Sequence, residues 1–372
     1  MRICHITSRH DWDDARIYQR ACIGLLREGL EVHLIATCPD VKPVQAGVQF
    51  HWLKQRQGWS RRIISSGEAF KQALDIDADV FHFHDPDLLP WMLLLSLKGK
   101  KVIYDVHENY AERILALKFP NWLKRLLAKL WSIFECFCGA KYAGIITTTQ
   151  SMQSLFTGIK TPTISVSNTP YLGVLVNTKL IVYKRPFTIY TSGEHSDRRN
   201  CMQTIEALPI ILKKIPEARL VFVGKFDPEG YDYSLKARAK ELGVETSVEI
   251  EGMLPYKENF ERTAKMEVGC VFYEDNVNNR VTIPNRLFEY MYARVAVIGE
   301  SFFEVKKVIE ESQCGAVVNS SDPKSIADAV INLFDDIPTL RKMQSNGRSK
   351  VISTYAYEHE LKKMIAFYNS LI

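Results

Sequence analysis

Two adjacent arginines, Arg198 and Arg199, stand in the segment SGEHSDRRN (192–200), between an expected strand and an expected helix. The free amides and the dipole at the start of a helix favour an anion, and acids are more usual than arginines at this place on a plain surface. Guanidinium groups pair well with phosphate oxygens and stabilise negative charge that grows on a leaving group. We therefore expect Arg198 and Arg199 to bind a diphosphate.

A second segment with binding chemistry is VTIPNRLFEYMYA (281–293). Pro284 is typical of a helix start, where the free amides of Asn285 and Arg286 can meet a phosphate. Glu289, about one turn into that helix, can accept hydrogen bonds from both hydroxyls of a ribose. Spacing alone also allows Glu289 to be an ordinary helix residue.

His107 and Glu108 end an apolar strand in KVIYDVHEN (101–109). A histidine at a strand tip can hydrogen-bond a substrate hydroxyl, and a neighbouring glutamate can orient it. The alternative is a loop histidine beside a solvated glutamate.

The first strand is followed by SRHDWDDAR (8–16), which contains no glycine. A dinucleotide-binding unit needs GxGxxG at this point, so the segment argues against a dehydrogenase. It offers His10, Asp14 and Arg16 as polar candidates instead. The alternative is that Asp14 caps a helix and Arg16 lies in solvent.

Asp85 and Asp87 flank Pro86 in FHFHDPDLLP (81–90) and superficially resemble a DxD metal motif. Proline between the two carboxylates suits a strand end followed by a helix start better. We therefore expect no metal site here.

Short apolar runs alternate with amphipathic stretches along almost the whole chain, which is typical of parallel α/β sheets. The helical stretches include 15–30 and 202–215, and the pattern restarts after a break near 170–186. The expected strands are 2–7, 31–37, 79–84, 101–107, 144–149, 187–192, 219–224, 247–252, 268–273, 295–300 and 315–320. At 372 residues, two doubly wound units are expected. Ligands of such sheets lie beyond the carboxyl ends of the strands, where the polar residues above occur.

Composition and charge narrow the class of protein. The eight cysteines form no CxxC pair and fit a reducing compartment. A strand that begins beside Met1 leads us to expect no signal peptide, and no run of residues is apolar enough to span a membrane. Residues 1–180 carry 22 Lys and Arg against 16 Asp and Glu, so the first half is basic. Nucleic acid is a poor fit, because no recognised binding motif accompanies this modest basicity.

The segment FPNWLKRLLAKLWSIFECF (119–137) combines an apolar helical stripe with Lys124, Arg125 and Lys129. Such a helix can lie on an anionic membrane surface. It can equally pack against the core with its lysines reaching solvent.

Taken together, the chain resembles the retaining, GT-B-fold family 4 glycosyltransferases, especially the bacterial type that builds surface polysaccharides. The likeness spans nearly the full length. The matching segments are 10–21, 81–90, 102–110, 164–170, 188–200, 283–291 and 315–330.

The resemblance implies an α/β protein of the GT-B fold, with two doubly wound parallel-sheet (Rossmann-like) domains facing across a cleft. Residues 1–175 with the last helix, 357–372, would bind a glycan or lipid-linked acceptor, and residues 183–356 a UDP or GDP sugar. His10, Arg16 and Glu108 would then contact the acceptor. No metal or other cofactor is implied.

By resemblance, Glu289 holds the ribose, Arg199 and Arg198 the diphosphate, and Met253 lies near the base, while His107 lies by the transferred sugar. A hexose would be transferred with retention, the leaving phosphate helping to deprotonate the acceptor. The implied role is the synthesis of lipopolysaccharide or capsule in the cytoplasm. In that role, segment 119–137 can contact the inner face of the plasma membrane.

Two positions depart from the family pattern. Val281 stands where many relatives have an acid, which leaves Asn278, Asn279 or Arg280 to contact sugar hydroxyls. Arg294 stands where glycine commonly ends the helix, which implies another ending or some strain. A sugar-nucleotide epimerase of GT-B architecture and a non-catalytic GT-B scaffold are the alternatives to a transferase.

Overall fold

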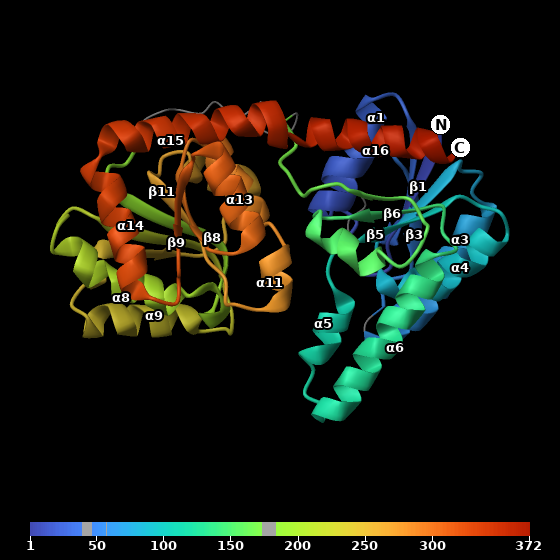
Figure 1. Ribbon diagram of the computed structural model, residues 1–372, viewed down its shortest axis with the longest axis horizontal. Coiled ribbons are helices and arrows are strands. Elements are labelled where there is room, and N and C mark those ends of the chain that lie inside the picture. The colour runs from blue at the N-terminus through green and yellow to red at the C-terminus, as the bar shows by residue number, and fades with distance from the viewer. Residues whose placement is uncertain (39–46, 57, 173–183) are drawn as a thin grey trace. The chain divides into compact units, whose positions relative to one another are not determined.

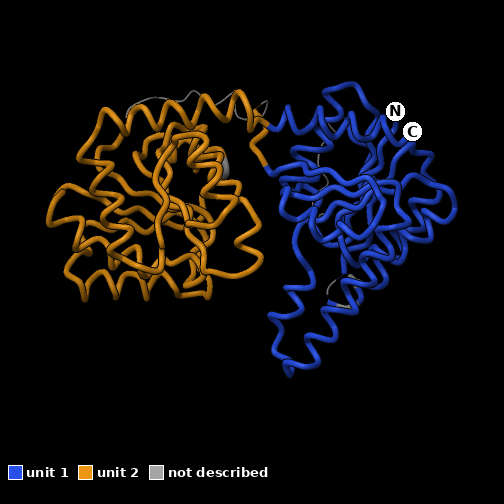
Figure 2. The backbone as a smooth tube through the Cα atoms, viewed as in Figure 1, with its two compact units in different colours: residues 1–168, 357–372 blue, residues 169–356 orange. Residues whose placement is uncertain are grey.

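The computed structural model describes residues 1–38, 47–56, 58–172 and 184–372. The chain divides into two compact units (Figure 2). Unit 1 contains Met1–Asn168 and Tyr357–Ile372, and unit 2 contains Thr169–Ala356. Unit 1 ends at Asn168, and the expected end of the first domain, residue 175, lies outside the described residues. The expected start of the second domain, residue 183, lies outside the described residues.

Unit 1 is built on a seven-stranded sheet in which neighbouring strands are parallel, in the order β3-β2-β1-β4-β5-β6-β7. Its chain runs outward from β1 to β3 and then returns to place β4 on the other side of β1. This reversal is the topological switch point at which open α/β sheets bind ligands. The strands are β1 (Arg2–Ile6), β2 (Glu31–Thr37), β3 (Gln49–Leu53), β4 (Val80–Phe83), β5 (Val102–Val106), β6 (Gly144–Thr147) and β7 (Thr163–Ser165).

The helices of unit 1 connect these strands (Figure 1). The stretch expected at 15–30 is a π-helix, η1, that continues as α1. The helices are η1 (Ala15–Cys22), α1 (Ile23–Arg27), α2 (Gly58–Ser60), η2 (Arg61–Ser65), α3 (Ser66–Asp75), η3 (Pro86–Leu88), α4 (Leu89–Leu97), α5 (Tyr110–Leu115), α6 (Asn121–Gly139) and η4 (Ser151–Phe156).

The last helix, α16 (Tyr357–Leu371), belongs to unit 1 and closes one side of its sheet. Tyr368 is fully buried, and its hydroxyl lies 2.6 Å from Nδ1 of His82 on β4. The Glu360 carboxylate accepts a hydrogen bond of 2.8 Å from the backbone amide of Ser167. Unit 1 therefore joins segments from both ends of the sequence.

Unit 2 repeats the arrangement with a six-stranded parallel sheet in the order β10-β9-β8-β11-β12-β13. Its switch point lies between β8 and β11. The strands are β8 (Thr188–His195), β9 (Arg219–Phe226), β10 (Val248–Glu251), β11 (Val268–Val271), β12 (Ala296–Glu300) and β13 (Gly315–Val318).

Helices cover both faces of this sheet, because its strands are apolar on both sides. Leu220 and Phe222 of β9 contribute to one core cluster, and the alternate residues Val221 and Val223 to the other. The helices are η5 (Asp197–Arg199), α8 (Cys201–Leu212), α9 (Tyr231–Glu241), η6 (Glu245–Ser247), α10 (Tyr256–Thr263), α11 (Val277–Val281), α12 (Asn285–Tyr292), α13 (Phe303–Ser312), α14 (Pro323–Asp335), α15 (Ile337–Lys350) and η7 (Val351–Tyr355).

Every strand expected from the sequence is present, and two were missed. β3 and β7 are the outer strands of the first sheet. Their residues are mostly half-buried, and β7 is only three residues long. Such edge strands lack the continuous apolar run by which buried parallel strands are recognised.

Helix α6 leaves most of its apolar side chains exposed. Trp122 is 68% exposed and Leu130 53%, whereas the residues buried along the helix are Ala128, Glu135, Cys138 and Gly139. The alternative in which the apolar stripe packs on the core is therefore wrong for most of its length. Among the described residues, no helix combines the length and the apolarity needed to cross a bilayer.

Candidate active site

Asp85 organises the polar residues at the carboxyl ends of β1 and β4. Its buried carboxylate accepts hydrogen bonds from the Thr7 hydroxyl (2.7 Å) and from the backbone amides of Ser8 (2.7 Å) and Arg9 (3.0 Å). His10 Nδ1 lies 3.0 Å from its other oxygen. Burial raises the pKa of Asp85, but the hydrogen bonds from His10, Thr7 and Ser8 together lower it by more. The pKa of Asp85 therefore lies below its ordinary value. Asp85 thus fixes the loop that carries His10.

The Asp85-Pro86-Asp87 segment forms a strand end followed by a helix start, as predicted. Pro86 occupies the first turn of η3 directly after β4. The Asp87 carboxylate lies 3.7 Å from Nε of Arg9. Arg9 thus contacts both carboxylates, Asp85 with its backbone amide and Asp87 with its guanidinium group.

A buried ion pair lies beside this group. Arg16, on η1, donates from Nε and Nη2 to the two oxygens of Asp105 on β5, at 2.8 and 2.7 Å. Its Nη1 donates to the Val166 carbonyl and to Asn168. Burial raises the pKa of Asp105, but Arg16 and the neighbouring histidines hold it well below its ordinary value. A bidentate ion pair of this kind fixes the orientation of both side chains and favours their charged forms.

Three buried histidines, His5, His82 and His84, form a cluster in which His82 and His84 contact Asp105. Oδ2 of Asp105 lies 3.1 Å from His84 Nδ1 and 3.5 Å from His82 Nε2. Burial lowers the pKa of all three, that of His84 to about 3, so they are neutral at pH 7. His84 also lies 2.9 Å from His5 Nδ1.

His107 lies at the exposed end of this network. Its Nε2 is 3.4 Å from Asp105 and 3.2 Å from His84 Nδ1, and its side chain is 16% exposed. Its ring centroid is 5.0 Å from that of His10. The structure therefore places both histidines together and holds each by a buried carboxylate.

Two sets of these side chains have ligand atoms close enough together for a metal ion: His5, His82 and His84, and His84, Asp105 and His107. In the second set, the guanidinium of Arg16 already binds both oxygens of Asp105. A cation at that point would face a fixed positive charge. The absence of a metal requirement remains a prediction.

The other polar candidates of unit 1, which include Arg16 and Glu108 from the predicted acceptor site, have different surroundings. Asp14 caps η1 by accepting bonds from the amides of Arg16 and Ile17, as the alternative interpretation held. Arg16 lies neither in solvent nor at a surface, because its guanidinium is buried against Asp105 and Asn168. Glu108 pairs with Arg113 on α5. A direct contact between Arg16 and an acceptor would require it to leave these partners.

In unit 2, two arginines lie against one tyrosine ring just beyond β11. The guanidinium carbon of Arg199 lies 3.8 Å from the ring centroid of Tyr273, and that of Arg286 lies 4.9 Å from it. Nη1 of Arg199 is buried and has no hydrogen-bond partner among the described residues. Burial lowers the pKa of Arg199, and Arg286 lowers it further, while Tyr273 raises it. Anionic oxygens would relieve this unmatched positive charge.

Arg286 is buried and held by its own partners. Its Nη1 donates to the Ser192 carbonyl of β8 (2.8 Å) and its Nη2 to the Phe272 carbonyl (3.2 Å). It thereby links β8 to the segment after β11. Nε of Arg286 is also buried and has no hydrogen-bond partner among the described residues, so both guanidinium groups keep an N–H group for a ligand.

The turn after β8 sets the position of Arg199. η5 ends at Asn200, whose left-handed backbone (φ 50°) turns the chain into α8. The Asn200 side chain donates to Ser320 Oγ at 2.6 Å, and Ser320 in turn donates to Glu300 at the end of β12. Arg199 therefore stands at the start of α8, beyond the switch point, on a turn held by residues at the carboxyl ends of β12 and β13.

Helix α12 begins as the sequence predicted. Pro284 is its N-cap residue, and Asn285 and Arg286 form its first turn. No side chain caps this end, which leaves first-turn amides for a ligand or water. Glu289 is half-buried one turn further on.

The remaining predicted donor residues are on the surface. The Arg198 side chain is 80% exposed and 4.0 Å from Glu274, and Met253 is 71% exposed after β10. Near Val281, Arg280 pairs with Asp275, and the side-chain amide of Asn279 donates to the backbone carbonyl of Glu274. Asn278 Oδ1 is buried and has no partner among the described residues. Of the three proposed substitutes for the missing acid, Asn278 keeps an unused polar atom.

Sequence reasoning missed Tyr273, Asp105 and the buried role of Asp85. Tyr273 ends the expected strand VGCVFY (268–273), in the same kind of position as His107. A polar ring at the end of an apolar strand was thus a usable signal. No comparable signal showed that Arg16 pairs with Asp105, 89 residues away.

Comparison with known families agrees with this division of the chain. Residues 15–166 match the family model of Glycosyltransferase Family 4, and residues 177–350 match that of Glycosyl transferases group 1. No protein among the curated sequences matches the chain.

Solved structures match the chain over its whole length. A sucrose-phosphate synthase from Thermosynechococcus elongatus has a TM-score of 0.76 at 14% identity, covering 100% of this chain and 99% of that one. Anabaena Alr3699/HepE in complex with UDP has a TM-score of 0.72 at 12% identity, with 100% of both chains covered. A glycosyltransferase from Rickettsia africae has a TM-score of 0.72 at 12% identity, covering 100% of this chain and 98% of that one.

At these identities the structures show the fold alone, and that fold is GT-B. The two family models identify the type of domain in each unit. The chain is a GT-B protein of the glycosyltransferase type, with a family 4 domain in its first unit and a group 1 domain in its second.

Proposed function

We propose that this protein transfers a hexose-type sugar from a nucleoside diphosphate, UDP or GDP, to a glycan or lipid-linked acceptor with retention. The observation that carries the proposal is the pair of arginines on Tyr273, at the start of α8 and of α12. Two cations beside two helix N-termini form a site for a diphosphate. That Anabaena Alr3699/HepE was solved with UDP supports UDP as the first nucleotide to test.

In this proposal the donor binds unit 2. Arg199, with Arg198 beside it, holds the diphosphate together with the amides of Asn285 and Arg286. Glu289 accepts hydrogen bonds from the ribose hydroxyls, and Met253 covers the base. As the sugar–oxygen bond breaks, negative charge grows on the leaving phosphate, and Arg199 stabilises it.

The acceptor binds the carboxyl edge of the unit 1 sheet, where His10 and Glu108 offer polar contacts. His107, oriented by Asp105, hydrogen-bonds the transferred sugar. Arg16 acts through Asp105 in this scheme. The leaving phosphate takes the proton of the acceptor hydroxyl on the same face, so the reaction needs neither a metal nor an enzyme nucleophile.

The proposed role is cytoplasmic synthesis of a surface polysaccharide such as lipopolysaccharide or capsule. The exposed apolar residues and the cations of α6 support peripheral association with an anionic inner membrane surface.

The test is calorimetric titration of the chain with UDP, GDP and ADP in EDTA. We expect one diphosphate to bind, and the variant Glu289→Ala to bind it at least tenfold more weakly. Glu241→Ala, an exposed glutamate on α9, is the matched control and should bind normally. If a folded wild-type chain binds none of the three, the transferase proposal fails and a non-catalytic scaffold is favoured.

A further inference from the structure

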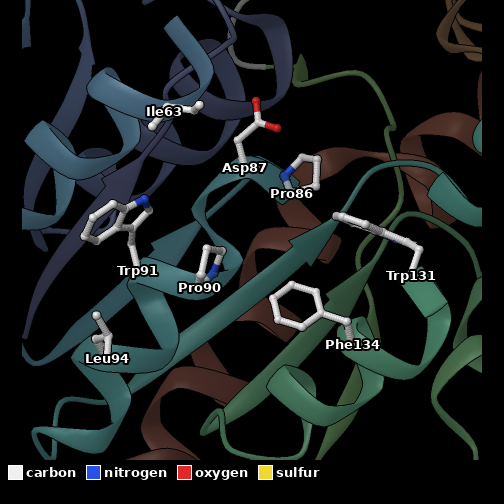
Figure 3. A pocket seen from close by; sticks show the side chains of 8 residues that line it. All are labelled: Ile63, Pro86, Asp87, Pro90, Trp91, Leu94, Trp131 and Phe134. Carbon is white, nitrogen blue, oxygen red and sulfur yellow. The ribbon is translucent and has the colours of Figure 1, made fainter. Parts of the chain in front are cut away.

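Unit 1 contains a cavity of about 500 Å³ that the proposed donor and acceptor contacts do not use. It lies among η2, η3, α4 and α6 (Figure 3). Its size is within the range of ~300–1,000 Å³ typical of small-molecule sites. The lining residues are Ile63, Pro86, Asp87, Pro90, Trp91, Leu94, Trp131 and Phe134.

The wall of the cavity is apolar apart from Asp87. Figure 3 shows Trp91 and Leu94 on one side, Trp131 and Phe134 on the other, and the Asp87 carboxylate at one end. Aromatic and aliphatic walls of this kind bind hydrocarbon, each buried methylene contributing ~0.8 kcal/mol.

The polar end of the cavity adjoins the proposed acceptor contacts. Asp87 pairs with Arg9, and Asp85, two residues earlier, pairs with His10. Asp85 already accepts hydrogen bonds and Asp87 faces the Arg9 guanidinium, whereas the Arg9 and His10 side chains remain 27% and 29% exposed. The chemistry left at this end therefore suits an anionic or hydroxyl-bearing head group.

The apolar wall continues onto the exposed face of α6. Phe134 both lines the cavity and is 37% exposed, and Leu130 and Phe137 beside it are more exposed. Lys124, Arg125 and Lys129 have no acidic partner within 4.0 Å among the described residues. A chain leaving the cavity along α6 would thus meet apolar side chains and unpaired cations, as at the surface of an anionic bilayer.

We propose that this cavity binds the hydrocarbon chain of a lipid-phosphate-linked acceptor, with its phosphate-bearing head toward Arg9 and His10. The inference rests on the proposed function and narrows it, since it selects a lipid-linked acceptor over a free glycan. An ordinary bilayer phospholipid is the competing occupant.

The probe is 12-bromododecyl phosphate, used below its critical micelle concentration, because bromine quenches tryptophan fluorescence on contact. We expect saturable quenching that is lost in the double variant Trp91→Phe/Trp131→Phe and retained in Trp122→Phe, whose side chain lies outside the cavity. The six-carbon analogue should bind at least 100-fold more weakly, because six methylenes are missing. Unsaturable quenching, or equal quenching in the double variant, would overturn the proposal.

A pair of substitutions on α4 tests the position of the chain. Leu94→Glu places a carboxylate in the cavity, and we expect it to weaken binding at least tenfold. Leu97→Glu makes the same change at a side chain 67% exposed and outside the cavity, and it should have no effect. Both sites are exposed enough for the variants to fold, which their circular dichroism can check.

The same samples separate the remaining outcomes. If 12-bromododecyl phosphocholine binds as tightly as the phosphate, the cavity belongs to a bilayer lipid and the acceptor assignment is wrong. If UDP binds while the brominated phosphate does not, this inference fails and the proposed transferase stands. Failure of every nucleotide to bind would instead count against the proposed function itself.

Discussion

At the scale of single residues, Arg199 and Arg198 show how neighbouring arginines come to differ. Arg199 stacks on Tyr273 and buries a nitrogen without a partner, whereas Arg198 points into solvent. Unpaired buried polar groups are costly unless a ligand satisfies them. The sequence could name the pair, but only the position of the Tyr273 ring separates their roles.

Arg199→Met should therefore weaken the binding of the preferred nucleoside diphosphate by about 10- to 100-fold. This is the loss of a charge-assisted hydrogen bond worth ~1.5–3 kcal/mol. Isothermal titration measures it. Arg238→Met, at an arginine on α9 that pairs with Glu206, should leave the affinity unchanged. Equal affinity of Arg199→Met and the wild type would remove Arg199 from the donor site.

Arg294 illustrates strain at one backbone position. After α12 ends, Arg294 adopts φ 58°, the left-handed conformation that glycine takes without penalty. Its amide bonds to the Met291 carbonyl, and its own carbonyl accepts from Lys184 Nζ. Helix α12 therefore ends in the left-handed conformation usual for glycine, although the residue there is an arginine. Of the two earlier expectations, strain at Arg294 is the one that holds, and a different helix ending is not found.

We expect Arg294→Gly to stabilise the chain by about 0.5–1 kcal/mol, since relief of the left-handed strain exceeds the entropic cost of glycine. Calorimetric melting of the full chain measures the change. Lys307→Gly, on the exposed side of α13 in ordinary helical conformation, should destabilise it by ~1 kcal/mol. A lower melting temperature for Arg294→Gly would contradict the interpretation.

At the scale of elements, α6 is the helix that the sequence left undecided. Its apolar stripe is exposed, so its amphipathic pattern cannot be explained by packing in the core of unit 1. Glu135 is the only acid on the helix and it is buried, hydrogen-bonded by the Tyr104 hydroxyl at 2.8 Å. The exposed part of α6 therefore carries only positive charge.

Reversing the three cations of α6 to glutamate should weaken binding to vesicles of phosphatidylglycerol and phosphatidylcholine by at least 100-fold. Each cation near an anionic surface contributes ~1 kcal/mol, so the loss should shrink as salt increases. Co-sedimentation with the vesicles measures it. The matched control reverses three exposed lysines of unit 2, Lys213, Lys214 and Lys240.

Unchanged binding of the α6 variant, or an equal loss in the control, would show that this helix does not direct membrane association. Loss of membrane binding with intact UDP binding would separate attachment from catalysis.

At the scale of the whole molecule, unit 1 encloses a set of histidines that are neutral because they are buried. An unfolded histidine has a pKa near ~6.5. The folded pKa values of His5, His82 and His84 lie below this, so the unfolded chain binds more protons below pH ~6.5. Their contribution to stability is complete above that pH and is lost as the pH falls toward the folded value, about 3 for His84.

His10 changes the stability of unit 1 with pH in the opposite direction. Burial lowers its pKa, but Asp85 raises it to a net value above the ordinary one, so its contribution is present below pH ~6.5 and is lost as the pH rises through the folded value. Asp105, with a depressed pKa, adds a loss of stability only below pH ~4. Glu135, whose pKa burial raises to about 7, acts in the same direction as His10, so three lowered histidines stand against two groups that add stability on acidification.

We therefore expect unit 1 to become less resistant to urea between pH 7.5 and pH 5. All six tryptophans lie in residues 12–131, so tryptophan fluorescence reports the unfolding of unit 1 within the intact chain. His84→Gln should reduce the dependence on pH. Resistance to urea that is constant or increases on acidification would contradict the assigned neutral state.

The sequence by itself determined the two parallel α/β units, because buried parallel strands are apolar throughout and their alternation with helices is visible locally. It also determined where polar residues follow strands, and so named His107, Arg199 and Glu289 as candidates. It missed β3 and β7, whose edge positions give no such pattern.

Only the tertiary structure decided the partners of these residues. The pairing of Arg16 with Asp105, the two arginines on Tyr273 and the cavity between α4 and α6 all join segments far apart in the chain. Local patterns record which face of an element is apolar but not which distant side chain meets it. Charge pairing and burial, and with them the pKa values, follow from those long-range contacts.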